Sequence, residues 1–197
     1  STFIWKHPSE DFNSLTQLIV HESQEAIFFM NGQALDLFGP GRYTLETQNI
    51  PKLGKLLNRT TGGDTPFHCE VYFINKTEQM SVKWGTDSKV QYIEPTYGFP
   101  ISIGASGEMS LRVEDSRKLL LKLVGTESFL GQQKLVSFFR AFLMTRVKTY
   151  MAQYMKNNTV SIFEIDEHLT AFSESLHTQL TPDFADYGIS LERFFVT

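Results

Sequence analysis

Three features are scarce in this 197-residue chain, and each scarcity excludes a class of protein. A single cysteine, Cys69, rules out an internal disulfide and fits a reducing cytoplasm. No apolar run approaches the roughly 20 residues needed to span a bilayer, and Ser1 to Phe12 has no signal-peptide pattern. Basic residues are not in excess, because the formal net charge is -4, and this argues against a nucleic-acid partner.

The hydrophobic content, 41% of residues with 17 Phe, predicts a folded domain with a core of its own. Strand-like patterns fill the first two-thirds of the chain, and helical patterns follow them. This order predicts an α+β fold in which helices pack on one side of a curved antiparallel sheet. We expect a single domain over residues 1–197, with the sheet mainly in 16–113, helices at about 115–124, 131–156 and 165–180, and a final strand at 189–196.

The stretch from Leu18 to Leu45 contains the clearest turn signals. Two short apolar runs lead to Asn31-Gly32, the dipeptide that best tolerates the positive φ angles of a type I′ turn, so a β-hairpin is predicted. Gly39-Pro40-Gly41 predicts a type II turn, since proline presets φ at the second position and glycine supplies the positive φ of the third. We interpret these five residues as structural turn residues.

Two later segments also have the pattern of strands. Phe67–Asn75 and Met80–Gly85 alternate apolar and polar residues, which predicts a second hairpin. Ile101–Val113 predicts a long strand that bends at Gly104 or Gly107, because glycine inside a strand usually marks a bend.

The helical patterns dominate after residue 131. The apolar residues of 131–156 fall within about half of a helical wheel, which is typical of an amphipathic helix packed on another element. The helix predicted at 165–180 is expected to end before Pro182, since the residue before a proline disfavours the helical conformation.

Charge separates these two predicted helices. Between Phe129 and Phe163 the charged side chains are all Lys or Arg, and between Glu164 and Asp186 they are all Asp or Glu. A basic amphipathic helix would suit anionic lipid, whereas adjacent helices of opposite charge would pair within the molecule. The second interpretation is favoured, since Arg146 falls within the apolar arc and the other bases scatter around the wheel. The candidate lipid or partner contacts are Lys134, Arg140, Lys148 and Lys156.

No catalytic, cofactor-binding or metal-binding residue is predicted. His68 and Cys69 are neighbours in a predicted strand, so their side chains point to opposite faces and cannot form a thiol–base pair. Cys69 is therefore interpreted as a buried structural residue. The five histidines have no metal-binding spacing. An enzyme of uncharacterised chemistry is the least favoured alternative.

The same opening stretch resembles that of the SPFH domain, also called the band 7 or prohibitin-homology domain, of stomatins, prohibitins and flotillins. The similarity covers nearly the whole chain and is closest to a bacterial branch described as virion core protein-like. It rests on Glu22 followed by Ala26-Ile27-Phe28-Phe29, then Asn31-Gly32, Gly39-Pro40-Gly41-Arg42-Tyr43-Thr44-Leu45 and Asn49-Ile50-Pro51.

The resemblance implies a non-enzymatic, membrane-associated scaffold that organises other proteins at the inner face of a bacterial membrane. The implied partners are further copies of the chain and the membrane surface, and the implied location is the cytoplasm, peripheral to the membrane. Family members usually have an N-terminal membrane segment and a helical C-terminal tail, which these residues lack, so we expect a monomer or weak dimer here and larger assemblies of the intact protein. The alternative is a soluble adaptor whose missing C-terminal region recognises the partner.

Overall fold

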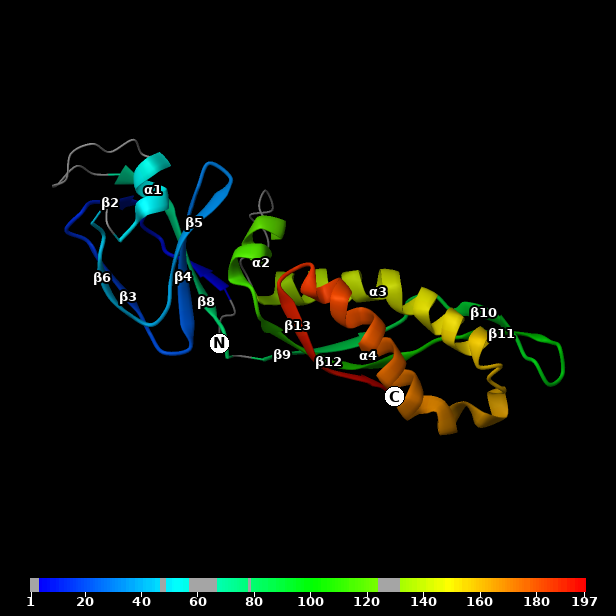
Figure 1. The fold of residues 1–197 in the computed structure, drawn as a ribbon. Helices are drawn as coiled ribbons and strands as arrows, with labels where there is room; N and C mark the ends of the chain where they lie inside the picture. The colour runs from blue at the N-terminus through cyan, green and yellow to red at the C-terminus, as the bar shows by residue number, and fades with distance from the viewer. Residues whose placement is uncertain (1–3, 47–48, 57–66, 78, 124–131) are drawn as a thin grey trace. The chain divides into compact units, whose positions relative to one another are not determined.

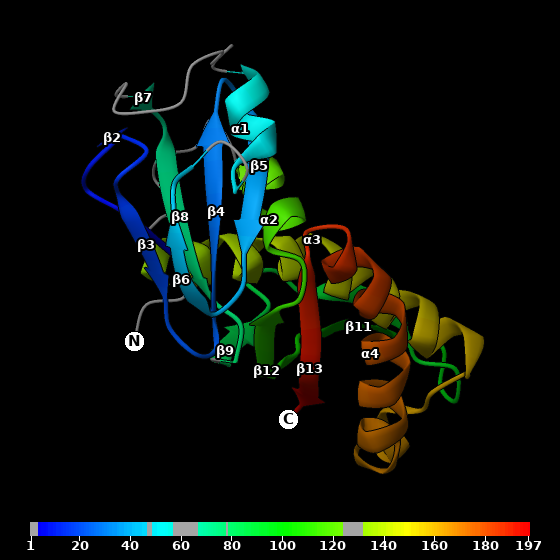
Figure 2. The ribbon, with the colours of Figure 1, turned by 60° about the vertical axis from the view of Figure 1, so that its left-hand side comes forward.

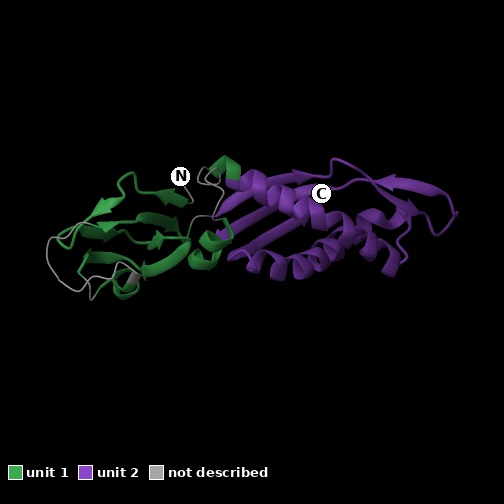
Figure 3. Cartoon of the chain, turned by 90° about the horizontal axis from the view of Figure 1, so that it is seen from above, with its two compact units in different colours: residues 1–78, 113–134 green, residues 79–112, 135–197 purple. Residues whose placement is uncertain are grey.

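The chain forms two compact units. The computed structural model describes residues 4–46, 49–56, 67–77, 79–123 and 132–197 (Figure 1). Unit 1 comprises residues 1–78 and 113–134, and unit 2 comprises residues 79–112 and 135–197 (Figure 3). The predicted α+β class with antiparallel sheets is confirmed. The single domain over residues 1–197 stays a prediction.

Unit 1 is built on a four-stranded antiparallel sheet, in which β4 lies between β5 and β8 (Figure 2). The sheet contains, in spatial order, β1 (Ile4–Lys6), β8 (Glu70–Asn75), β4 (Gln24–Met30) and β5 (Gln33–Phe38). Two short antiparallel pairs are β3 (Gln17–Val20) with β6 (Gly41–Thr44), and β2 (Asp11–Phe12) with β7 (Phe67–His68). The helices are α1 (Pro51–Leu56) and α2 (Ser116–Leu123). Phe28 is fully buried in a core with Leu35, Ile50, Leu53 and Val71.

The turns of unit 1 explain its glycines. Asn31 and Gly32 have φ angles of 52° and 74°, both positive as a type I′ turn requires, and they join β4 to β5. Gly41 has a φ of 151°, far from the roughly +80° of the type II turn that was predicted. The hydroxyl of Tyr43 instead donates to the carbonyl oxygens of Gly39 and Pro40, at 3.0 and 3.4 Å. The positive φ of Gly41 is strained for a residue with a side chain, and a Cβ at Gly41 would also lie 3.0 Å from that hydroxyl oxygen, so glycine is favoured there.

Asp36 connects β5 to the start of α1. Its buried carboxylate accepts hydrogen bonds from the backbone N–H groups of Lys52 and Leu53, at 3.1 and 2.8 Å. Pro51, at the first helical position, has no N–H to satisfy. The carboxylate therefore satisfies two of the N–H groups that the first turn of a helix leaves unpaired.

Unit 2 combines a three-stranded sheet, a hairpin and two long helices. The sheet has the order β13 (Ile189–Val196), β12 (Ser106–Val113) and β9 (Met80–Gly85), and the hairpin pairs β10 (Val90–Ile93) with β11 (Pro100–Ile103). The helical elements are α3 (Gln132–Asn157), the 3₁₀ helix η2 (Ile162–His168) and α4 (Leu169–Ala185). Figure 2 shows α4 running beside β13. The observed bounds of α2, α3 and β13 lie close to the ranges predicted from sequence, 115–124, 131–156 and 189–196. Residues 124 and 131 of these ranges lie outside the described part of the chain.

Gly104 and Gly107 have different roles. The predicted long strand is interrupted at Gly104-Ala105, between β11 and β12. Gly107 lies inside β12, where an added Cβ would meet the carbonyl oxygen of Phe195 at 1.8 Å and the Trp84 ring at 2.8 Å. The Trp84 ring stacks on Phe194 with centroids 5.4 Å apart. Gly107 therefore permits the close approach of β13 to β12.

The predicted second hairpin is wrong. Strand β8 pairs with β1 and β4 in unit 1, whereas β9 pairs with β12 in unit 2, from Met80 opposite Leu111 to Gly85 opposite Ser106. The two strands are neighbours in sequence, and the alternation that predicted each strand was correct. Strand pairing is decided by which sheet buries each apolar face, and the chain passes from one unit to the other after residue 78.

The predicted end of the last helix is also corrected. Helix α4 begins later than expected, at Leu169, and continues through Pro182 to Ala185. A proline inside a helix removes one hydrogen bond and crowds the carbonyl group four residues before it, and here it stands three residues before the helix ends. Continuing the helix places Phe184 in the core, where it is fully buried and packs against Phe139 and Phe142. Burial of this ring offsets the lost hydrogen bond.

Side chains from the helices reach both outer strands of the three-stranded sheet. On β13, His177 Nε2 donates to the Leu191 carbonyl at 2.7 Å, and Ser173 Oγ accepts from the Val196 N–H at 3.0 Å. On β9, Arg140 Nε donates to the Lys83 carbonyl at 2.8 Å. Each outer strand therefore has backbone groups already bonded by a helix side chain.

Candidate functional site

The four bases predicted as lipid or partner contacts have different surroundings. Arg140 is half-buried and bonds the Lys83 carbonyl, while Lys148 lies 3.4 Å from Asp87 Oδ1. Lys134 and Lys156 are exposed and make no ion pair with a described residue. A lipid or partner contact by any of these four remains a prediction.

Arg146 shows how the basic and acidic helices do pair. Its Nε lies 3.5 Å from Asp183 Oδ2 on α4, and its guanidinium stacks 3.6 Å from the centre of the Phe142 ring. Tyr150 donates to the same carboxylate at 2.6 Å, and this hydrogen bond, with burial and the charge of Asp183, raises the pKa of Tyr150. The contact is intramolecular, so these residues hold α3 against α4 rather than facing a partner.

A cluster of exposed apolar side chains lies at the β10–β11 loop and the start of η2, and we call it the aromatic tip. Tyr97 is its centre, with ring centroids 5.7 Å from Phe163 and 6.3 Å from Phe99. The tip consists of Ile93, Tyr97, Phe99, Ile162 and Phe163, which are 68%, 67%, 42%, 37% and 72% exposed. Such a concentration of exposed large apolar residues marks an interaction surface in proteins generally.

Glu94 holds the loop of the aromatic tip in shape. Its side chain is fully buried, and Oε2 accepts from the Tyr97 N–H at 2.7 Å. The backbone N–H of Glu94 donates to the Phe99 carbonyl, and the Glu94 carbonyl accepts from the Gly98 N–H. Burial acts to raise the pKa of Glu94, but the Tyr97 N–H, together with the nearby Ser161, Thr96 and Ile162, outweighs it, and the pKa is lowered. Its other oxygen, Oε1, has no hydrogen-bond partner among the described residues. The carboxylate is therefore a charged anchor under the loop.

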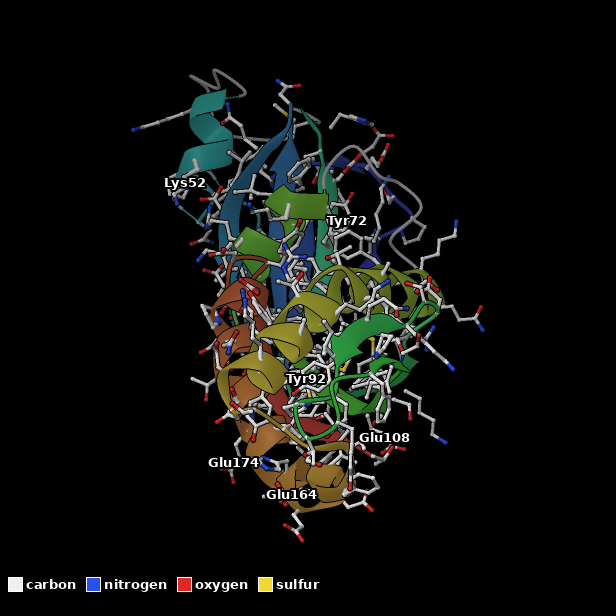
Figure 4. The ribbon with its side chains drawn as sticks, turned by 90° about the vertical axis from the view of Figure 1, so that its right-hand side faces the viewer. Lys52, Tyr72, Tyr92, Glu108, Glu164 and Glu174 are labelled. Atoms are coloured by element: carbon white, nitrogen blue, oxygen red, sulfur yellow. The ribbon has the colours of Figure 1, made fainter. Side chains whose placement is uncertain are left out.

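A second anchor ties the tip to α3. The Tyr92 hydroxyl donates to the carbonyls of Val160 and Met155, at 2.7 and 3.2 Å. Burial raises the pKa of Tyr92, and the charge of Glu94 adds to the effect. Figure 4 labels Tyr92 and, on η2, Glu164. The exposed rings are thus presented by a hydrogen-bonded framework.

Three exposed acidic side chains lie beside the aromatic tip. Glu164, Asp166 and Glu167 on η2 are all exposed. Attraction to anionic lipid is therefore not what this surface favours, and its binding would depend on the apolar rings.

Sequence reasoning did not identify the aromatic tip. Pro95, Tyr97-Gly98 and Pro100 indicate a break in the chain, and turn residues of this kind carry no period that marks exposure. The available signal was the presence of Tyr97 and Phe99 within a turn, where large apolar residues have no strand or helix to bury them.

Cys69 and His68 occupy different environments. Cys69 is 1% exposed within the core of unit 1, whereas His68 is exposed, with Nδ1 3.1 Å from Asp11 Oδ1 and Nε2 3.4 Å from Glu10 Oε2. Burial raises the pKa of the Cys69 thiol to about 12, with smaller contributions from the charges of Glu10 and Glu70. Within the described residues no group of three His, Cys, Asp or Glu side chains could hold a metal ion.

We expect the native chain to resist alkylation of Cys69 by iodoacetamide at pH 8, reacting about a hundredfold or more slowly than the urea-unfolded chain, because the thiolate is the nucleophile. Since the folded pKa is raised, the thiol stays neutral throughout pH 7–9. Mass spectrometry of timed samples measures the rate. A Ser9→Cys/Cys69→Ser variant, with an exposed thiol, is the control and should react at the unfolded rate. Rapid labelling of native Cys69 would contradict its structural assignment.

Comparison of this chain with models of known protein families identifies the family to which it belongs. The model of the SPFH domain-Band 7 family matches residues 4–197. The chain belongs to this family. Family members are generally membrane-associated scaffolds and generally non-enzymatic. No described helix of the chain is long and apolar enough to cross a membrane.

One relative of this chain is the uncharacterized protein YdjI of Bacillus subtilis (strain 168). It is 28% identical to this chain over 193 residues, which are 96% of the chain and 58% of YdjI. The chain therefore spans a little over half the length of this relative.

Proposed function

We propose that this chain is a non-catalytic scaffold domain that contacts a bacterial membrane surface through the aromatic tip and organises partner proteins there. The observation that carries the proposal is the exposure of five large apolar side chains on one hydrogen-bonded framework. Membership of a generally membrane-associated family supports the choice of a bilayer as the contact. The location would be peripheral, on the cytoplasmic side.

The chemistry of the tip suits the interface between lipid headgroups and acyl chains. Tyrosine and phenylalanine place large apolar area at this depth, and the tyrosine hydroxyl stays in water. Transfer of each ring would contribute about 1–2 kcal/mol, since the rings are already partly covered. A single tip would bind weakly, so copies held side by side in an assembled protein would bind by avidity.

The test is co-sedimentation with phosphatidylcholine vesicles, which carry no net charge. We expect a Tyr97→Ser/Phe163→Ser double variant to partition at least about tenfold more weakly than the unmodified chain, since two of the apolar rings are removed. Leu15→Ser is the matched control, because Leu15 is 68% exposed but lies in unit 1. Its partition should be unchanged.

Two results would count against the proposal. Equal partition of the double variant and the unmodified chain would remove the tip as the contact. Absence of binding by the unmodified chain would favour the adaptor alternative, in which a protein rather than a bilayer is the partner. Circular dichroism of each variant checks that the fold is retained.

A further inference from the structure

A second surface of unit 2 combines positive charge with a cavity. The cavity, of about 440 Å³, lies among β9, β12, β13 and α3. The side chains that define its chemistry are Lys83, Glu108, Ser110, Arg140, Arg193 and Phe195. We call it the basic groove.

The balance of charge in the basic groove is opposite to that of the chain. Three cationic side chains and one carboxylate line it, a local formal charge of +2, while the whole chain has a net charge of -4. Glu108, labelled in Figure 4, stands opposite Lys83 in the β9–β12 register, yet the two side chains form no ion pair. Lys83 and Arg193 are therefore in no ion pair with a described residue, although the Glu108 carboxylate also lines the groove.

The bases of the groove come from three elements. Lys83 is on β9 and Arg193 is on β13, and both are exposed without a partner among the described residues. Arg140, on α3, uses its Nε to donate to the Lys83 carbonyl at 2.8 Å. That bond orients the guanidinium and leaves its terminal amino groups without a described partner, as a site for an oxyanion requires.

Ser110 adds an unexplained buried hydroxyl to the groove lining. The residue is 7% exposed, and its Oγ has no hydrogen-bond partner within the described structure. An unpaired buried hydroxyl is unfavourable, so such a group calls for an explanation such as an absent ligand. Ser110 is therefore a residue of the groove lining whose hydroxyl finds no partner among the described residues.

We propose that the basic groove binds a phosphate group, supplied either by a lipid headgroup or as free phosphate. Planar guanidinium groups match phosphate oxygens in two-point contacts, and the Lys83 ammonium adds a third charge. Phe195, 52% exposed at the same groove, offers apolar surface to whatever carries the phosphate. This inference is independent of the aromatic tip.

Isothermal titration with inorganic phosphate at low salt tests the site. Arg193→Gln should weaken binding about tenfold, as expected for loss of a charge-assisted contact. Lys89→Gln removes the same charge from an exposed position outside the groove and should leave the affinity unchanged. Arg193→Lys should restore part of the affinity. Undetectable binding, or equal losses in the two glutamine variants, would overturn the proposal.

Ser110→Ala separates a ligand-binding role from a structural one. Removing an unpartnered hydroxyl should leave the melting temperature unchanged or higher while weakening phosphate binding severalfold. A lower melting temperature with unchanged affinity would remove Ser110 from the site.

Vesicles distinguish the two sources of phosphate. For a lipid headgroup, phosphatidic acid added to phosphatidylcholine vesicles should increase binding of the unmodified chain and of Lys89→Gln but not of Arg193→Gln. For free phosphate, titration should detect binding and the added lipid should give no increase. Arg193→Gln should keep its binding to pure phosphatidylcholine, so failure of the groove and failure of the tip give different results.

Discussion

Gly107→Ala is expected to lower the free energy of unfolding by about 3 kcal/mol, at the upper end of the usual cost of overpacking. The new methyl group would lie 1.8 Å from the Phe195 carbonyl oxygen, which is backbone and cannot turn away. Strand β13 would have to move away from β12, and the Trp84–Phe194 stack would be disturbed with it. Urea unfolding followed by tryptophan fluorescence measures the change.

Gly85→Ala is the matched control in the same sheet. Gly85 pairs with Ser106 on β12, and a Cβ there would have its nearest neighbour at 3.7 Å, an ordinary van der Waals contact. This substitution should change stability by less than about 0.5 kcal/mol, as exposed positions without special contacts usually do. Similar losses for Gly85→Ala and Gly107→Ala would mean that the contact with Phe195 is not the cause.

Asp36→Ala should cost about 2–3 kcal/mol. The substitution leaves the N–H groups of Lys52 and Leu53 without their acceptor and removes the link between β5 and α1. Because Leu53 is fully buried, water cannot readily replace the lost carboxylate there. The melting temperature and the urea midpoint measure the loss.

Two further variants test whether the lost hydrogen bonds of the Asp36 carboxylate cause the loss of stability. Asp36→Asn keeps one acceptor oxygen and should lose roughly half as much stability. Asp11→Ala removes an aspartate whose side chain is 85% exposed, and its effect should stay within about 0.5 kcal/mol. If Asp36→Ala were no more destabilising than Asp11→Ala, the capping role would be wrong.

The features predicted correctly from sequence are local. The β4–β5 hairpin follows from Asn31-Gly32 and β13 follows from its alternation, since each depends on residues close together in the chain. The pairing of β9 with β12 was missed because it joins segments more than 20 residues apart. No local pattern specifies such a partner.

The candidate surfaces were less accessible to sequence reasoning. The helical wheel scatters the predicted bases and so indicates no shared surface, yet Arg140 lines the groove together with Lys83 and Arg193, which are far from it in sequence. The aromatic tip likewise joins the β10–β11 loop to η2. Both surfaces form where segments that are distant in sequence pack together. A periodic pattern in the sequence indicates only which face of one segment is buried, so it does not predict such a surface.

The bonded outer strands of unit 2 bear on how copies of this protein could associate. A bare sheet edge recruits a strand from another molecule, and this is the route to templated fibres and to open-ended aggregation. In this unit such recruitment would first have to displace His177 and Ser173 from β13, or Arg140 from β9. Strand exchange at either of these two strands would therefore begin with the loss of hydrogen bonds that the folded unit already makes.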